Sequence, residues 1–202
     1  ALILWVGRAL RSLQKAGVWP DFTINLETQD VAAQFAGIDL HNIPGVILAA
    51  NSHPALYALP AQHILSYCPN TNTEGWMFAP SVPVREISSG GSVSCSAFSL
   101  AMAWSCNPII LVGQDLSFSG GAYYHSEGAD GDAKAVFDPR TGHWQLQDYS
   151  ADLAHTLAEQ IKDDGLRFSG AEVPGYYGGT VPTSTDFAAF RAWFEHTALD
   201  LK

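Results

Sequence analysis

The sequence predicts an α/β fold: a doubly wound, mostly parallel sheet of the Rossmann-like kind with helices on both faces. Short continuous apolar runs recur along the chain, as at residues 2–6, 45–50 and 108–113, and each ends in glycine or in polar residues. Such runs are typical of strands buried on both faces of a parallel sheet. Segments with helical patterns lie between them, and this alternation is what builds a parallel sheet.

The first 30 residues predict one strand–helix–strand unit. Residues 2–6 form its first strand, and a helix follows with Leu10 and Leu13 on one stripe and Gly17 just past its end. Residues 22–26 alternate into the next strand. Because such crossovers are right-handed, the two strands should be parallel and near neighbours.

The middle of the chain predicts further strands and one core helix. Residues 45–50 and 63–67 are strand candidates, and an Asn-, Thr- and Pro-rich stretch at 69–83 is expected to be a loop. Residues 92–105 carry small and apolar side chains almost all round, which indicates a helix packed closely against the sheet. Residues 108–113 are expected to form a fully buried strand.

The last part of the chain predicts a long loop and two helices. A polar, Gly-rich stretch at 113–132 is expected to be a functional loop. Residues 150–164 place apolar side chains at spacing four, as an amphipathic helix does. Thr183 and Asp186 have the spacing of a capping box for a last helix at 187–199.

Composition and charge narrow the class of protein. The 202 residues are 47% apolar, enough for one sizeable core, so we expect a single domain over residues 1–202. The formal net charge of -10 disfavours nucleic acid as a partner. Three cysteines without CxxC spacing favour a reduced, cytoplasmic setting over a disulfide framework. No apolar stretch is long enough to span a membrane, so no membrane partner is expected.

Candidate ligand-binding residues follow directly on the predicted strands. Ligands of open parallel sheets bind beyond the carboxyl ends of the strands. Any one polar residue there is also compatible with an ordinary turn, and an aspartate with capping a neighbouring helix. Their convergence on one edge favours ligand contact. The candidates are Glu27, Asn51, Gly113, Gln114 and Asp115.

The glycine pair Gly90–Gly91 opens the helix expected at 92–105, and Ser92 is suited to cap it. Amides at a helix N-terminus bind phosphate or carboxylate even in an acidic protein. His125 lies in the long loop. Histidine suits a general base that deprotonates an acceptor hydroxyl, and a surface loop histidine is the alternative.

Motifs for metals and common cofactors are weak or missing. The tripeptide Asp130-Gly131-Asp132 is similar to the DxD metal clamp of nucleotide-sugar transferases, but it is also common turn chemistry, so no metal site is expected. The chain has no GxxxxGK[ST], GxGxxG, HExxH or GxSxG motif. P-loop kinases, standard dinucleotide oxidoreductases, zincins and serine hydrolases are therefore disfavoured.

Three stretches resemble one known family. The run ISSGGSVSCSAFSLAMAWSCNPIILVGQDLSFSGG at 87–121 resembles the central motif of Maf-type motility-associated proteins, glycosyltransferases that modify flagellin. AGVWPDFTINLE at 16–27 and VPGYYGGTVPTSTDFAAFRAWFE at 173–195 resemble that family's flanking elements, in the expected order. The central run is similar, more distantly, to bacterial sialyltransferases.

The resemblance implies transfer of a sialic, pseudaminic or legionaminic-type (nonulosonic) acid from a CMP-activated donor to Ser or Thr hydroxyls of flagellin. By that analogy the Gly90–Ser92 turn and Asp115 line the nucleotide site, with Asp115 and His125 as the catalytic candidates and no cofactor required. The family's first strand and its Gly-Pro-Ser turn would precede Ala1, so we expect a fragment lacking them.

Two other functions stay open. Archaeal hydroxymethylpterin pyrophosphokinases share this superfamily and resemble the same central run. Such an enzyme would need ATP and Mg²⁺, and the acidic loop would then be the metal site. A non-catalytic flagellin-binding module would keep the same crevice for packing only.

Overall fold

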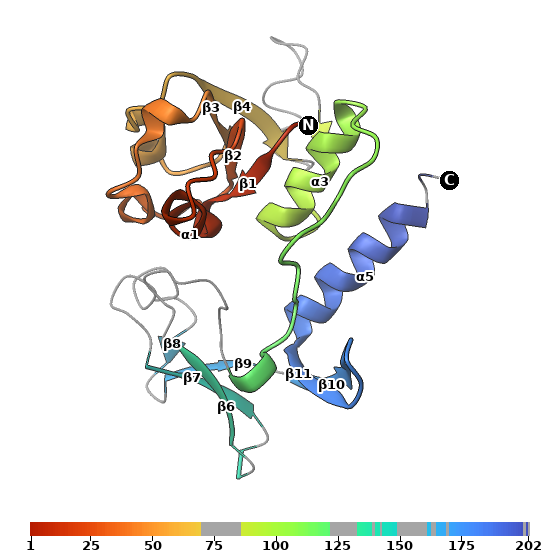
Figure 1. The fold of residues 1–202 in the computed structure, drawn as a ribbon. Coiled ribbons are helices and arrows are strands. Elements are labelled where there is room, and N and C mark those ends of the chain that lie inside the picture. Colours follow the sequence, from red (N-terminus) through yellow and green to blue (C-terminus); the bar gives the residue numbers. More distant parts are fainter. Residues whose placement is uncertain are drawn as a thin grey trace. The chain divides into compact units, whose positions relative to one another are not determined.

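The structure is a computed structural model that falls into two compact units, Ala1–Ile110 and Leu111–Lys202, which are described one at a time (Figure 1). The prediction of one domain over residues 1–202 remains a prediction. The residues described are 1–69, 86–121, 133–138, 140–141, 143–148, 161–162, 165–168, 170–199 and 201.

The first unit is built on a five-stranded sheet in the order β1-β2-β3-β4-β5, in which every neighbouring pair is parallel (Figure 1). All five residues of the central strand are buried, as expected for a strand covered on both faces. The first four strands predicted from the sequence are confirmed. The strands are β1 (Leu4–Val6), β2 (Phe22–Asn25), β3 (Gly45–Ala49), β4 (Ile64–Pro69) and β5 (Glu86–Ile87).

Short helices cover one face of this sheet. The side chains of Val46 and Leu48 point to that face and join a buried cluster with Leu10, Phe35 and Leu56. The last three belong to three different helical segments, so the chain wraps this face in short pieces. The segments in the unit are η1 (Gly7–Ala9), α1 (Leu10–Lys15), η2 (Ala32–Phe35), η3 (Leu40–Asn42) and η4 (Pro54–Ala58).

The other face is covered by α3 (Val93–Ala103), whose Leu100 packs in a second buried cluster with Ile24 and Ile47. Neighbouring residues of β3 therefore point to opposite cores, which is the alternation that a strand imposes. With helices on both faces of a parallel sheet, the predicted Rossmann-like α/β fold is confirmed.

The helix α3 runs antiparallel to the strands. The ring of Trp104, just past its last turn, lies 5.4 Å from the ring of Phe22, the first residue of β2. Its first turn follows β5 after only five residues. The N-terminus of α3 therefore lies at the carboxyl ends of the strands.

The predicted strand at 108–113 is wrong. Residues 108–113 form no strand and pair with none of the strands in the described part of the chain. The side chains of Ile110 and Val112 are 77% and 84% exposed. An apolar run supplies the side chains of a buried strand, but a strand also needs a neighbour for its backbone groups. Here the run is the connection between the two units.

The described residues of the second unit form two small antiparallel sheets and one long helix (Figure 1). A four-stranded sheet has the order β6-β7-β9-β8, and a hairpin of β10 and β11 leads into α5 (Thr185–Leu199). The sequence did not predict these sheets. The strands are β6 (Lys134–Asp138), β7 (His143–Gln147), β8 (Ile161–Lys162), β9 (Gly165–Phe168), β10 (Gly170–Pro174) and β11 (Thr180–Ser184).

Phe118 anchors this unit. Its side chain is 1% exposed, and its ring lies 5.1 Å from that of Phe187 on α5 and 6.2 Å from that of Trp144 on β7. Its backbone N–H donates to the carbonyl of Pro182 on β11 at 2.8 Å. The first part of the polar stretch that the sequence predicted to be a loop is thus fixed by one buried aromatic residue.

Two further helix predictions need correction. Ile161, expected at the end of a helix over 150–164, lies in β8, while residues 149–160 are outside the described residues. The expected capping box of the last helix does not form, because the Thr183 hydroxyl donates to the carbonyl of Leu116 at 2.7 Å. Ser184 instead accepts from the N–H of Phe187 at 3.1 Å. The loop expected at 69–83 lies outside the described residues apart from Pro69, the last residue of β4.

Candidate functional site

Asn25 and Gly7 lie together at the carboxyl edge of the parallel sheet. Asn25, the last residue of β2, is 3% exposed, and its Oδ1 accepts from the N–H of Glu27 at 2.7 Å. Its Nδ2 has no hydrogen bond within the described part of the chain. A Cβ at Gly7 would lie 3.3 Å from that nitrogen, so the glycine leaves space above the amide. The Asn25 side chain is thus nearly buried as a whole, while its Nδ2 group faces the space that Gly7 leaves.

The loops after β2 and β3 meet at the same edge. The N–H of His53 donates to the carbonyl of Glu27 at 2.9 Å, which brings the predicted candidates Glu27 and Asn51 onto neighbouring loops. Asn51 is exposed, whereas Ser52 is 6% exposed and its hydroxyl has no hydrogen-bond partner. A buried hydroxyl without a partner costs free energy, so it marks a place where a polar ligand atom would be favourable.

His53 has a local structural role. Its Nδ1 accepts from the N–H of Ala55 at 3.2 Å and so caps the short helix η4. An accepting Nδ1 carries no proton, which leaves the proton of the neutral ring on Nε2. Its Nε2–H is therefore the group that remains to donate.

The turn before α3 has the geometry that the sequence predicts. Gly90 and Gly91 have φ angles of 52° and 88°, in the left-handed region that favours glycine. The hydroxyl of Ser92 accepts from the N–H of Cys95 at 3.1 Å, which confirms Ser92 as the N-cap. The N-terminus of an eleven-residue helix, with its partial positive charge, thus lies on the same edge of the sheet as Asn25.

Burial governs the titration of the two groups behind this turn. Burial raises the pKa of the Cys95 thiol, and the hydrogen bond with Ser92 only partly offsets it, so Cys95 is a neutral packing residue. Burial also raises the pKa of Tyr67, on β4, whose hydroxyl lies near the Ser96 hydroxyl. Neither hydroxyl makes a hydrogen bond of good geometry within the described residues. The Cys95 thiol and the Tyr67 hydroxyl are therefore both neutral at physiological pH.

The remaining predicted site residues belong to the second unit or lie outside the described residues. Gly113, Gln114 and Asp115 precede Phe118 in an irregular segment, and Asp115 is exposed rather than desolvated at the end of a strand. Its contact with a ligand stays a prediction, as does its proximity to Ser92. His125 and the Asp130–Asp132 tripeptide lie outside the described residues.

The sequence reasoning missed Gly7 and Asn25, and it did not single out Ser52 within the polar cluster from Asn51 to His53. Asn25 stands at a buried position of β2, and a buried polar residue needs a partner. Gly7 closes the first apolar run, where a ligand or side chain approaches the backbone closely. These signals were present in the sequence, but only the structure shows that Asn25 Nδ2 and Gly7 are neighbours.

Residues 1–121 match the model of a family described as "6-hydroxymethylpterin diphosphokinase MptE-like". The match covers more than half of the 202 residues and includes the whole first unit. The chain belongs to this family. The match to the family model ends at Gly121, the last residue of the short helix η5 (Ser119–Gly121) that follows Phe118.

A solved structure with a similar fold is titled "Structure of MAf glycosyltransferase from Magnetospirillum magneticum AMB-1". The TM-score is 0.63 at 20% sequence identity, over 96% of this chain and 25% of that chain. At this identity the similarity shows the fold alone. The chain spans a quarter of the length of that structure's chain. No curated protein matches.

The described residues contain neither a membrane-spanning helix nor a metal-binding cluster. No helix there is both long enough and apolar enough to cross a membrane. No group of three or more His, Cys, Asp or Glu side chains in the same part of the chain is placed to hold a metal ion.

Proposed function

We propose that the chain is the donor-binding core of a glycosyltransferase that moves a nonulosonic acid from a CMP-activated donor to a hydroxyl group of an acceptor protein, with flagellin as the acceptor. The proposal depends above all on Asn25, a nearly buried amide whose Nδ2 has no partner at the edge where α3 begins. An accessible amide donor and a helix N-terminus can both bind an anion.

The leaving phosphate of the donor is the anion that this edge would bind. The glycines before Ser92 would let a phosphate oxygen approach the first N–H groups of α3. Negative charge grows on the leaving group as the reaction proceeds, and fixed donors stabilise it without reorganising. A CMP-linked sugar carries a single phosphate. The N–H groups of the protein can therefore balance the charge of that phosphate without a metal or other cofactor.

The transfer step forms one bond to the sugar and breaks another. The acceptor hydroxyl oxygen forms a bond to the anomeric carbon, and the bond from that carbon to the phosphate oxygen breaks with its electron pair on CMP. The hydroxyl proton passes to a general base, for which His125 is the candidate. Asp115 would accept a hydrogen bond from a donor hydroxyl.

A second candidate function comes from the family's own description. A hydroxymethylpterin diphosphokinase would bind ATP with Mg²⁺ and a pterin, and it would use the same edge for the triphosphate. The pterin has a flat ring and no anomeric centre, so the two candidates differ in both ligands. We propose a cytoplasmic setting for either activity, because three cysteines without CxxC spacing do not suggest a disulfide framework.

Thermal unfolding with added ligands separates these candidates. A ligand that binds only the folded protein stabilises it by RT ln(1 + [L]/Kd), so CMP and CTP should raise the Tm and ATP with Mg²⁺ and a pterin should not. Stabilisation by ATP with Mg²⁺ and a pterin, without an effect of cytidine nucleotides, would replace the first candidate by the second. No effect from any of them would favour the non-catalytic flagellin-binding module.

Asp115→Ala tests the part of the site taken from the sequence alone. It should abolish the shift caused by CMP and leave the Tm of the ligand-free protein unchanged, because Asp115 is exposed. The matched control is Asp186→Ala, which removes another exposed carboxylate in the first turn of α5. A CMP shift that persists in Asp115→Ala would remove this residue from the site.

A further inference from the structure

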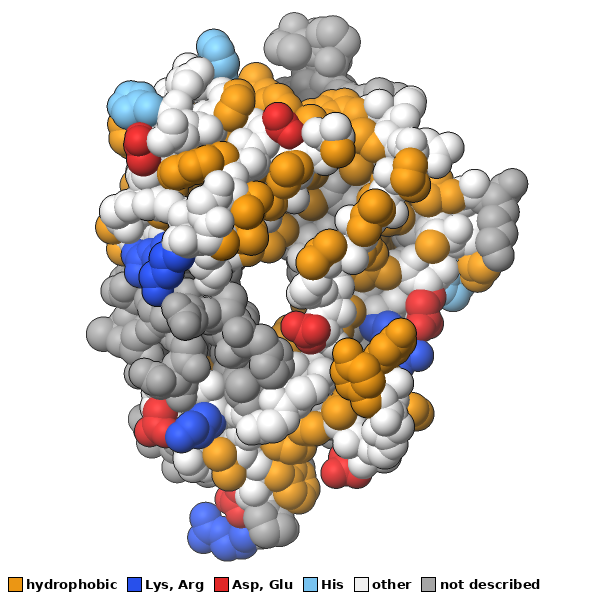
Figure 2. Space-filling model, viewed as in Figure 1, with side chains coloured by type: hydrophobic (Ala, Val, Ile, Leu, Met, Phe, Trp, Pro, Cys, Tyr) orange, Lys and Arg blue, Asp and Glu red, His pale blue; other side chains and the backbone are white. Residues whose placement is uncertain are grey.

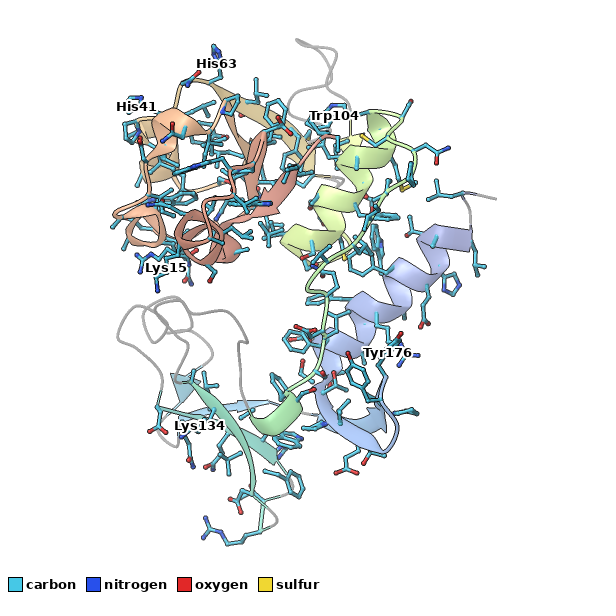
Figure 3. All side chains as sticks on the ribbon, in the orientation of Figure 1. Lys15, His41, His63, Trp104, Lys134 and Tyr176 are labelled. Atoms are coloured by element: carbon cyan, nitrogen blue, oxygen red, sulfur yellow. The ribbon has the colours of Figure 1, made fainter. Side chains whose placement is uncertain are left out.

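Tyr176 and Tyr177 are almost fully exposed at the turn of the β10–β11 hairpin (Figure 3). Their exposed fractions are 96% and 98%, and their rings meet edge to face with centroids 5.0 Å apart. Other hydrophobic side chains are spread over the face seen in Figure 2. Exposed apolar residues scattered singly are normal on protein surfaces, but two adjacent tyrosines with nearly complete exposure are not.

The hairpin presents the two rings on an ordered turn. The N–H of Gly175 donates to the carbonyl of Gly179 at 3.0 Å, and the N–H of Gly178 donates back to the carbonyl of Gly175 at 3.1 Å. Below the turn, the hydroxyl of Thr180 donates to Glu172 Oε2 at 2.9 Å across the two strands. These contacts fix the backbone beneath the rings, which lowers the entropy lost when a partner covers them.

The stretch of sequence that contains the two tyrosines is acidic. Residues 168–190 contain no Lys, Arg or His, and they include the carboxylates Glu172 and Asp186. The next basic residue, Arg191, is already paired with Glu195 at 2.8 Å. Glu172, which the Thr180 hydroxyl holds on the hairpin, is therefore the negative charge that a cationic partner would meet there.

We propose that the hairpin tip is a docking element for a basic segment of another protein, with Arg or Lys side chains over the rings of Tyr176 and Tyr177 and near Glu172. The face of a tyrosine ring attracts cations, and arginine stacks on it most readily. Tyrosine and arginine are also enriched among the residues that dominate interfaces. The net charge of -10 would speed encounter with such a partner. The docking is independent of donor binding at the sheet edge.

The size of the element sets the strength of the interaction. Two tyrosines bury roughly 300–500 Å² when covered, well below the ~1,200 Å² of a stable interface. The hairpin alone therefore supports a weak and reversible contact. Binding should depend on salt, because the charges involved are exposed.

Titration with short synthetic peptides tests the proposal. The whole chain is titrated at low salt with an Arg-Gly repeat, a Lys-Gly repeat and a Glu-Gly repeat, followed by NMR chemical shifts. The Arg-Gly peptide should bind most tightly and the Glu-Gly peptide not at all. The double variant Tyr176→Ala, Tyr177→Ala should lose at least about tenfold in affinity for the Arg-Gly peptide. The variant with both tyrosines changed to Phe should keep most of it, because the rings remain.

The control is Leu199→Ala, which removes a 61% exposed apolar side chain from the last residue of α5 and should leave peptide binding unchanged. Equal binding of the Arg-Gly peptide by the double alanine variant would overturn the proposal, as would no binding by the unmodified protein. Binding of a neutral oligosaccharide such as chitotetraose, lost in the alanine variant, would replace a protein partner by a glycan. The CMP shift should be the same in all these variants, so failure here and failure of the proposed function are distinguishable.

Discussion

Replacing Asn25 by Asp tests whether the carboxyl edge of the parallel sheet binds an anion. The two side chains have the same shape, and Oδ1 of either accepts from the N–H of Glu27, a contact of 2.7 Å in the structure. The change replaces the unpartnered Nδ2 donor by an oxygen that carries negative charge. Because the residue is 3% exposed, water screens that charge poorly.

The expected loss of affinity follows from the charge. Two like charges about 4 Å apart repel by about 4 kcal/mol at an effective dielectric constant of ~20. Since 1.4 kcal/mol is a factor of ten, CMP should bind roughly a thousandfold more weakly to Asn25→Asp. Burial raises the pKa of a carboxyl group, so lowering the pH should neutralise the new aspartate first and restore part of the affinity.

Isothermal titration calorimetry with CMP measures this loss. The control is Gln147→Glu, which adds the same single negative charge at an exposed position of β7 in the other unit. Circular dichroism melts confirm that both variants are folded. If Asn25→Asp binds CMP within about threefold of the unchanged protein, or if the control loses as much, the anion does not bind next to Asn25.

Three further predictions concern stability. Ser92→Ala removes the N-cap acceptor for Cys95 N–H and should lower the free energy of unfolding by about 1 kcal/mol in urea titrations, with Ser92→Asp restoring most of it; equal stability of all three proteins would contradict the cap. Gly170→Ala would drive a methyl group into the carbonyl oxygen of Thr183 and to within 2.7 Å of Trp144 Cδ1. It should lower the free energy of unfolding by roughly 1–3 kcal/mol. An unchanged Tm would refute the register of the hairpin. Burial raises the pKa of Tyr67 above its usual 10.0, so the unfolded chain loses this proton first and the free energy of unfolding should fall as the pH rises above about 10. Urea titrations at pH 9 and 11 should show a smaller fall for Tyr67→Phe. An equal fall in the variant would exclude Tyr67 as its cause.

Four of the five strands of the first unit and the capped helix α3 could be predicted from the sequence, because their signals are local. A continuous apolar run such as 45–50 has few other places to go than the centre of a sheet, and β3 is buried along its whole length. The turn at Gly90–Gly91 and the cap at Ser92 depend on backbone angles and a hydrogen bond within six residues of chain. Short-range geometry of this kind is encoded where it is used.

The candidate site divides in the same way. The sequence indicated the correct edge of the sheet through Glu27 and Asn51, since the carboxyl ends of parallel strands meet there. It did not single out Asn25 or Ser52, because the importance of both depends on burial, and that of Ser52 also on a hydroxyl without a partner. Burial and partners are set by residues elsewhere in the chain.

Sequence alone therefore determined the elements whose pattern is contained within about ten residues: the buried strands, the glycine turn and the helix cap. Tertiary structure alone decided what each exposed or polar group meets. The apolar run at 108–112 finds no neighbouring strand among the described residues, while Phe118, in a polar stretch, becomes the buried anchor of the second unit. The physical reason is that burial and backbone pairing are properties of two segments brought together, and the second segment lies far away in the chain.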